Sequence, residues 1–125
     1  MYQTIQNNQT GIKFGNLLFS EPVALPSTPS MLDQVLPQPG LYVILTPDVR
    51  CTPRPFRLIY IGESENVNMR ATAAHEKFSE WKREAGTAQL YRAVCALPGT
   101  TKPQRQATET ALIRSYAPPC NKVLS

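Results

Sequence analysis

The stretches GLYVIL (residues 40–45) and LIYIG (residues 58–62) decide the fold of this chain. Both are short, apolar and rich in β-branched or aromatic side chains, and each is bounded by a glycine, as strands commonly are. The residues between them, 46–56, contain three prolines, which suit a loop better than a crossover helix. The sequence therefore predicts strands at Leu41–Leu45 and Leu58–Ile61 that pair antiparallel as a hairpin.

Residues 64–85 follow the hairpin with a different period. Apolar side chains recur there at steps of three and four, the spacing of one face of an α-helix, at Val67, Ala71, Ala74, Phe78, Trp81 and Ala85. Ser64 or Asn66 can cap the start of such a helix, and Gly86 stands where a helix commonly ends. The pattern predicts one amphipathic helix over this range.

The last part of the chain predicts one more strand and one more helix. Residues 89–97 form a third apolar run that ends at a Pro-Gly pair. Thr100 or Thr101 can cap a helix that continues to about Tyr116, where a pair of prolines stops it. The element order β-β-α-β-α predicts an α+β domain over residues 39–125, with a small, mainly antiparallel, three-stranded sheet flanked by helices.

Residues 1–38 differ from the rest of the chain because they are rich in proline. Five prolines lie from Glu21 to Pro39, which excludes a long helix or a central strand there. We expect an extended arm packed on the domain, in which Ile12–Phe19 adds a short edge strand. Apolar residues favour such packing over the alternative, a flexible linker: Val23, Leu25, Met31, Leu32, Val35 and Leu36.

Composition narrows the function classes. The chain has 125 residues, enough for one domain, and no run near the roughly 20 apolar residues of a membrane span. No basic start followed by an apolar stretch marks a secretory signal, so we expect a cytoplasmic protein with no membrane partner. The net charge of +4 and a pI near 9.2 favour a polyanionic partner such as nucleic acid.

The cysteines give little reason to expect a metal site. Cys51, Cys95 and Cys120 are widely spaced and form no Cys-x-x-Cys pair. With His75 they would complete a tetrahedral set of ligands, but scattered free thiols in a reducing compartment fit the spacing better. A zinc site is therefore not expected.

Some side chains are candidates for chemistry, each with a plain structural alternative. Glu109 shares a helix face with the apolar residues three, four and seven positions on, where a carboxylate needs a cation or an arginine unless its head group reaches water. Arg70 lies at the edge of the apolar stripe, where packing its stem on Trp81 is the ordinary role. Tyr42 and Tyr60 suit half-buried strand positions, and a phenol hydroxyl can also orient or deprotonate a water.

Five elements in a fixed order resemble the GIY-YIG nuclease superfamily. They are GLY at residues 40–42, YIG at residues 60–62, Arg70, Glu109 and Asn121. The resemblance covers roughly residues 39–122, and the family's core has the β-β-α-β-α order predicted above.

The resemblance implies a role for each matching residue. Tyr42 matches the tyrosine thought to act as general base or to orient the attacking water, and Tyr60 matches the one beside the water and the scissile phosphate. Arg70 matches the arginine that binds this phosphate, and Asn121 the asparagine that braces the site. Glu109 matches the carboxylate that anchors one divalent ion, Mg²⁺ or Mn²⁺. The implied function is a metal-dependent DNA endonuclease with a one-metal mechanism.

Two positions differ from the family pattern. Glu63 directly follows the second motif, where many members carry a basic or small polar residue. His75 lies five residues after Arg70, whereas some members place a histidine one turn after the arginine. An ideal helix puts His75 on the opposite flank from Arg70, so it is either a candidate catalytic residue that positions water or an ordinary surface histidine. Charge and position make three residues the expected phosphate contacts: Lys77, Lys102 and Arg105.

Two alternatives to an independent nuclease remain open. The first is a non-catalytic nucleic-acid-binding or partner-binding module that keeps the fold. The second is a subunit that cuts DNA only with a protein partner or as a homodimer, since nothing in these 125 residues resembles a recognition helix or a zinc finger. Magnesium-dependent stabilisation that requires Glu109 would separate an enzyme from a binding module.

Overall fold

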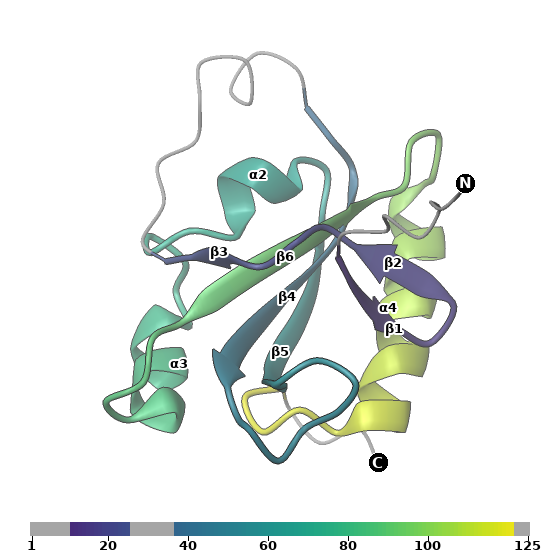
Figure 1. Cartoon of the computed structure of the whole chain (residues 1–125). Helices are drawn as coiled ribbons and strands as arrows, with labels where there is room; N and C mark the ends of the chain where they lie inside the picture. The colour runs from purple at the N-terminus through teal and green to yellow at the C-terminus, as the bar shows by residue number, and fades with distance from the viewer. Residues whose placement is uncertain (1–10, 26–36, 122–125) are drawn as a thin grey trace, which may run out of the picture.

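The computed structural model describes residues 11–25 and 37–121, and these form an α+β fold with antiparallel sheets and helices (Figure 1). The elements follow in the order β1 (Ile12–Phe14), β2 (Leu17–Phe19), β3 (Val23–Ala24), β4 (Gly40–Pro47), β5 (Phe56–Ser64), α2 (Val67–Arg70), α3 (Phe78–Ala85), β6 (Tyr91–Ala96) and α4 (Lys102–Tyr116). The predicted α+β class is confirmed. None of the helices described is long and apolar enough to cross a membrane.

The hairpin of β4 and β5 organises the main sheet. The two strands pair antiparallel, with Val43 opposite Ile61 and Tyr42 opposite Gly62. β6 pairs antiparallel with the other edge of β4. The three strands that the sequence predicts are therefore confirmed, and β4 lies between two neighbours.

The main sheet has four strands, not the predicted three, in the order β3-β6-β4-β5. The additional strand, β3, has two residues and pairs antiparallel with β6, with Val23 opposite Arg92. A segment this short, directly after Pro22, is too short to show the alternation that marks a strand. In addition, β1 and β2 form a separate two-stranded sheet, not the single edge strand expected over Ile12–Phe19.

The described part of the proline-rich arm contributes to the core. Ile12, Phe14, Phe19 and Leu25 are all buried, and β2 and β3 run beside β6 (Figure 1). The packing expected of four further apolar residues falls outside the residues that the structure describes: Met31, Leu32, Val35 and Leu36.

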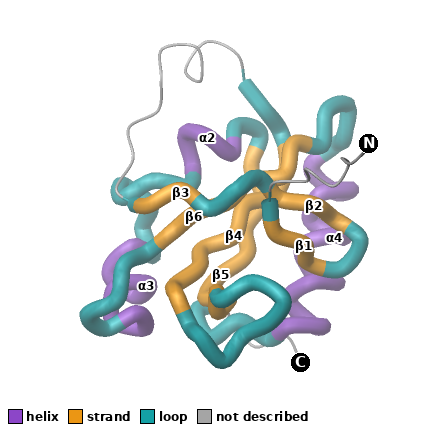
Figure 2. The backbone as a smooth tube through the Cα atoms, viewed as in Figure 1, coloured by secondary structure: helices purple, strands orange, loops and turns teal. Residues whose placement is uncertain are grey.

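The single helix predicted over residues 64–85 is wrong. The helices α2 and α3 are separate and are joined by a loop over residues 71–77 (Figure 2). Two side chains in this loop accept hydrogen bonds from backbone N–H groups: Thr72 Oγ1 from Ala74 at 3.3 Å, and His75 Nδ1 from Lys77 at 2.9 Å. Such local bonds compete with helix formation, and the apolar period does not reveal them.

Helix α4 begins and ends where the sequence predicts. Thr101 Oγ1 accepts from the N–H of Gln104 at 3.3 Å, and Gln104 Oε1 accepts from the N–H of Thr101 at 2.8 Å. This reciprocal capping box satisfies two backbone donors at the start of the helix. The helix packs against β5 and carries Leu112 into the core.

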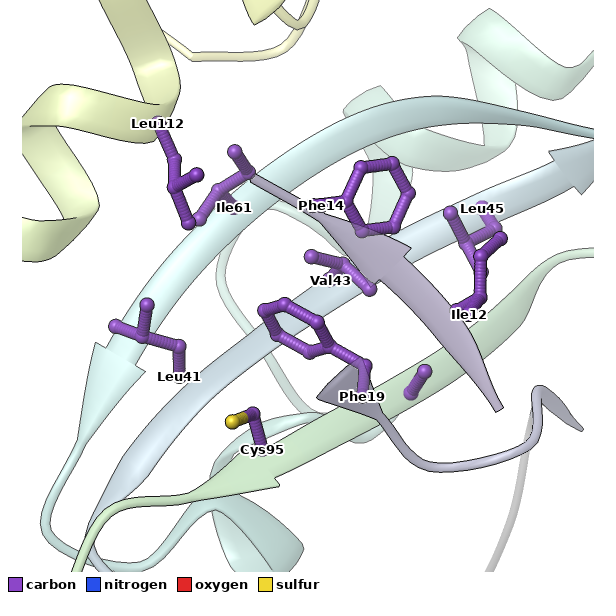
Figure 3. Close-up of a cluster of buried hydrophobic side chains, with 10 residues drawn as sticks. Ile12, Phe14, Phe19, Leu41, Val43, Leu45, Ile61, Cys95 and Leu112 are labelled. Atoms are coloured by element: carbon purple, nitrogen blue, oxygen red, sulfur yellow. The ribbon is translucent and has the colours of Figure 1, made fainter. Parts of the chain in front are cut away.

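The side chains of β4 alternate between two faces of the sheet. Leu41, Val43 and Leu45 point to one face, where they meet β1, β2 and α4 (Figure 3), whereas Tyr42 and Ile44 point to the other, where they meet α2 and α3. The apolar face is the cluster of Ile12, Phe14, Phe19, Leu41, Val43, Leu45, Ile61, Ala93, Cys95 and Leu112. The aromatic face is the cluster of Leu25, Tyr42, Ile44, Ile59, Val67, Ala71, Trp81, Leu90 and Cys120, with Tyr60 packed against it.

Candidate active site

Tyr42 and Tyr60 lie on the aromatic face, on the adjacent strands β4 and β5. Their ring centroids are 6.1 Å apart. Gly62 makes room for this arrangement, because a Cβ at that position would overlap the ring and hydroxyl of Tyr42. Gly40 likewise lies against the carbonyl oxygen of Cys95, so a side chain there would force β4 and β6 apart. These two glycines, both at the open end of the hairpin, are therefore required by close packing.

The Tyr42 hydroxyl is hydrogen-bonded to His75. The distance from Tyr42 Oη to His75 Nε2 is 2.8 Å, and the imidazole is 0% exposed. Because Nδ1 accepts from the N–H of Lys77, the proton of the neutral ring is assigned to Nε2, which donates to Tyr42 Oη. Burial lowers the pKa of His75 to about 4, so the ring is neutral at pH 7.

The structure contradicts the helical placement expected for His75 and the alternative that it is an ordinary surface histidine. It is neither on the opposite flank of a continuous helix from Arg70 nor at the surface, because the loop over residues 71–77 directs it into the aromatic face. Trp81 and Tyr60 pack against it, with ring centroids 4.5 Å and 5.6 Å from that of the imidazole. The sequence identifies Trp81 as a core residue, and its contact with His75 depends on the loop.

Burial also controls the two phenols. It raises the pKa of Tyr42 and of Tyr60 above the ordinary value for tyrosine. The positive charge of Arg70 acts in the opposite direction on both residues, with a smaller effect. Both tyrosines therefore keep their hydroxyl protons at neutral pH.

Arg70, the last residue of α2, brings positive charge to the site. Its Nη2 lies 2.5 Å from Oε2 of Glu76, and this contact lowers the pKa of Glu76 to about 2. Arg70 also lines an open pocket of about 310 Å³, together with Glu63, Ser64, Glu65 and Lys102. A polar ligand can thus reach the guanidinium from the pocket.

The predicted phosphate contacts occupy three different environments. Lys102 is exposed at the start of α4 and lines the pocket beside Arg70. Lys77 lies 3.7 Å from Glu80 in a surface ion pair. The third residue, Arg105, is buried. Of the three, Lys102 has the position expected of a phosphate contact.

Arg105 is 3% exposed and lies inside the fold, contrary to the expectation for a phosphate contact. Its Nε donates to Oε2 of Glu63 at 3.1 Å, and its Nη1 donates to the carbonyl oxygen of Thr100 at 2.8 Å. Glu63 is 42 residues away in the sequence, so no local pattern reveals this pairing. Arg105 therefore does not have the position expected of a phosphate contact.

Glu109 approaches the tyrosines from α4. Burial raises the pKa of Glu109, and the charge of Glu63 raises it further, whereas the backbone of Glu63 acts in the opposite direction. The charge of Glu109 in turn raises the pKa of Tyr42 and of Tyr60. A half-buried carboxylate thus lies close to both phenols.

Glu109 fits a divalent cation of the magnesium type. Within the described residues, no group of three or more His, Cys, Asp or Glu side chains could hold a metal ion. Mg²⁺ commonly binds through one or two carboxylates and retains several waters, so a half-buried carboxylate next to the pocket residue Glu63 suits it. Mn²⁺ accepts the same oxygen ligands.

Asn121 braces the second motif from the outer side of β5. Its Oδ1 accepts from the N–H of Ile61, and its Nδ2 donates to the carbonyl of Ile61, both at 2.9 Å. The N–H of Cys120 donates to the carbonyl of Ile59 at 3.0 Å. The carboxamide thus pairs with the strand as a second backbone would, directly between Tyr60 and Gly62.

No protein-family model, curated protein or solved structure matches this chain. Tyr42, Tyr60, Arg70, His75 and Glu109 come from separate segments and act on one another through hydrogen bonds, ring contacts or charge. Asn121 joins them through its two bonds to Ile61.

Proposed function

We propose that this chain is a DNA endonuclease of the GIY-YIG type that hydrolyses phosphodiester bonds with one divalent cation, Mg²⁺ or Mn²⁺. One observation carries the proposal: Tyr42, from β4, lies within electrostatic reach of Tyr60 from β5, Arg70 from α2 and Glu109 from α4. Phenols, an arginine and a carboxylate together supply what phosphodiester hydrolysis needs, namely a positioned water, a phosphate ligand and a cation ligand. A cytoplasmic location remains a prediction.

Tyr42 would orient the attacking water and not deprotonate it in the resting site. Its Oη receives the hydrogen bond of His75 Nε2, and its raised pKa keeps the hydroxyl proton in place. The remaining lone pair of Tyr42 Oη can accept a hydrogen bond from a water. His75, held by the N–H of Lys77, fixes the direction of the Tyr42 hydroxyl.

Arg70 would bind the scissile phosphate and stabilise its developing charge. A guanidinium offers five N–H donors in a planar fork, and Glu76 occupies Nη2, so other donors remain for a phosphate in the pocket. Lys102, on the same pocket, adds a second positive charge. Substrate affinity is expected to fall steeply with salt, because phosphate contacts release counterions.

Glu109 would hold the divalent cation. When bound, such a cation supplies stabilisation of negative charge on the oxygen that leaves the phosphate. Burial of Glu109 strengthens its attraction for a cation, because a half-buried carboxylate is poorly solvated and screened. Asn121 would keep Tyr60 in register by holding Ile61.

A cleavage assay tests the proposal. Wild-type protein is incubated with duplex, branched and single-stranded DNA in Mg²⁺ or Mn²⁺, beside Glu109→Gln and a matched control, Glu84→Gln, in which an acid on α3 is changed. We expect cleavage by wild type and Glu84→Gln, and a loss of at least about 100-fold in Glu109→Gln, as for other groups that stabilise transition-state charge. Absence of cleavage on every DNA, or full activity of Glu109→Gln, overturns the proposal.

A non-catalytic nucleic-acid-binding module is the second candidate, and one contact favours it. The ion pair of Arg70 with Glu76 engages the arginine that a nuclease would use on phosphate. Such a module would bind DNA without any magnesium-dependent rise in melting temperature. A magnesium-dependent rise that disappears in Glu109→Gln would instead favour the enzyme.

A further inference from the structure

A second carboxylate, that of Glu63, lies within electrostatic reach of Glu109. Glu63 directly follows Gly62 at the end of β5, and its charge acts on Glu109. Its side chain lines the pocket beside Arg70 and is 12% exposed. Two ionised carboxylates at a cation site would bind the cation more tightly than one, or would draw in a second ion.

Arg105 holds the Glu63 carboxylate. The contact from Nε to Oε2 is 3.1 Å, with 3% of the arginine side chain exposed. Arg105 is itself fixed, because Nη1 donates to the carbonyl and the hydroxyl of Thr100 at 2.8 Å and 3.4 Å. The Thr100 hydroxyl donates in turn to the carbonyl of Leu97. The guanidinium therefore cannot swing away from Glu63 without breaking several bonds.

One turn of α4 carries both the residue that binds the Glu63 side chain and the carboxylate on which its charge acts. Arg105 and Glu109 are four residues apart on this helix, the spacing that puts side chains on one side. Arg105 donates to the side chain of Glu63, and the charge of Glu63 acts on Glu109. The same helix thus presents one carboxylate to the site and neutralises the other.

We propose that Arg105 is a positioning residue that engages the Glu63 carboxylate in a neutral pair and so leaves Glu109 as the carboxylate available to the divalent cation. The inference rests on the proposed function, since it concerns the cation that Glu109 would hold. It explains how an acid is accommodated directly after the second motif. It also predicts that the two members of the pair affect cation binding with opposite signs.

Mn²⁺ binding tests this assignment without any cleavage assay. Electron paramagnetic resonance of the free ion measures the Kd for Mn²⁺. The proteins are wild type, Arg105→Met, Glu63→Gln, the double variant Glu63→Gln/Arg105→Met and Glu109→Gln. Arg114→Met is the matched control, because Arg114 is an exposed arginine on the same helix. Circular dichroism and thermal melting check that each variant is folded.

The two single variants of the pair are expected to change the Kd for Mn²⁺ in opposite directions. Arg105→Met leaves the carboxylate of Glu63 without its partner and should lower the Kd for Mn²⁺ at least about tenfold. Glu63→Gln leaves the positive charge of Arg105 without its partner and should raise the Kd at least about fivefold. Changes of this size are expected for a unit charge a few ångströms from the ion. The double variant removes a neutral pair and stays within about threefold of wild type. A purely structural role would weaken binding in all three variants.

The outcomes separate the two proposals. If Mn²⁺ binding in wild type is absent or survives in Glu109→Gln, the cation site of the proposed function is wrong, and this inference fails with it. If binding requires Glu109 but Arg105→Met and Arg114→Met match wild type, the inference alone is overturned. If Arg105→Met does not fold, Glu63→Gln is compared with the double variant, and equal affinities overturn the inference.

Discussion

The two faces of the sheet share the central strand β4 but differ in how their side chains are held: one face packs only apolar groups, and the other also buries polar groups. On the apolar face, Leu41, Val43 and Leu45 meet other hydrophobic side chains, and shape alone determines how well they pack. On the aromatic face, Tyr42 and Tyr60 carry hydroxyls into the interior beside His75. Buried polar groups need hydrogen-bond partners, so this face requires defined bonds as well as defined volumes.

A strand alternates its side chains between faces, so β4 contributes a hydrophobic core on one side and a hydrogen-bonded polar group on the other without any added residue. The apolar face should therefore respond to mutation mainly through stability, and the aromatic face mainly through activity and pH dependence. The following changes test this division, from the largest expected effect to the smallest.

Tyr42→Phe is expected to have the largest effect. Loss of the hydroxyl removes the group that would orient water, and we expect the cleavage rate to fall about 10²- to 10³-fold, as for the loss of other positioned hydrogen-bonding groups. Single-turnover cleavage at saturating DNA is the measurement. Tyr91→Phe is the matched control, since Tyr91 packs against the apolar face. A rate for Tyr42→Phe within threefold of wild type would show that the hydroxyl has no such role.

Leu45→Ala should destabilise the fold without touching the chemistry. Leu45 is 0% exposed on the apolar face, and removing a buried leucine costs about 2–5 kcal/mol in free energy of unfolding. Urea titration gives this free energy, and the cleavage rate per folded molecule should equal that of wild type. A more than tenfold fall in that rate would mean that the apolar face also controls the site.

His75 should make stability depend on pH. Its pKa is about 4 in the folded chain and 6.5 ordinarily, so between these values the unfolded chain binds a proton that the folded chain does not. The free energy of unfolding therefore falls as the pH drops from about 7 to 4, by about 3 kcal/mol at about 1.4 kcal/mol per pH unit. Below pH 4 this contribution is constant.

Urea titrations across this pH range, on wild type and His75→Gln, isolate the effect of the histidine. Other carboxyl groups titrate in both proteins, so the difference between the two curves reports on His75. We expect that difference to change by most of the stated amount between pH 7 and pH 4. Parallel curves would contradict the buried, neutral imidazole.

Asn121→Ala is expected to have the smallest effect of the four. It removes two hydrogen bonds to Ile61, each with a net contribution of about 1 kcal/mol, so we expect a loss of about 1–2 kcal/mol in free energy of unfolding. Because the strand carries Tyr60, the cleavage rate should also fall, by about tenfold or less. An unchanged protection of the Ile61 amide in hydrogen exchange would argue against the bracing role.

Local signals explain why much of the fold is predictable from sequence. The strands β4, β5 and β6 have clear apolar runs, and α4 has a capping threonine at its start. What could not be predicted depends on contacts between distant residues or on side chains that bond to nearby backbone. The strand β3 gains its structure from pairing with β6, and Thr72 and His75 interrupt a helix whose apolar period is otherwise continuous.

The candidate site shows the same division. The candidate residues Tyr42, Tyr60, Arg70 and Glu109 can be found in the sequence because they stand in the order of the GIY-YIG resemblance. The structure places Tyr42 within electrostatic reach of the other three. The hydrogen-bond and ion-pair partners of the site residues either are distant in sequence or lie in the loop over residues 71–77. His75 on Tyr42, Glu76 on Arg70 and Arg105 on Glu63 could not be found from periodicity.

The pairing of Asn121 with β5 has a consequence for self-association. β5 is an edge strand of the main sheet, and unpaired N–H and C=O groups on such an edge can recruit a strand from another molecule. The carboxamide of Asn121 and the N–H of Cys120 occupy the outward groups of Ile61 and Ile59. A residue that steadies one tyrosine thus also blocks intermolecular strand addition along the most apolar stretch of this edge.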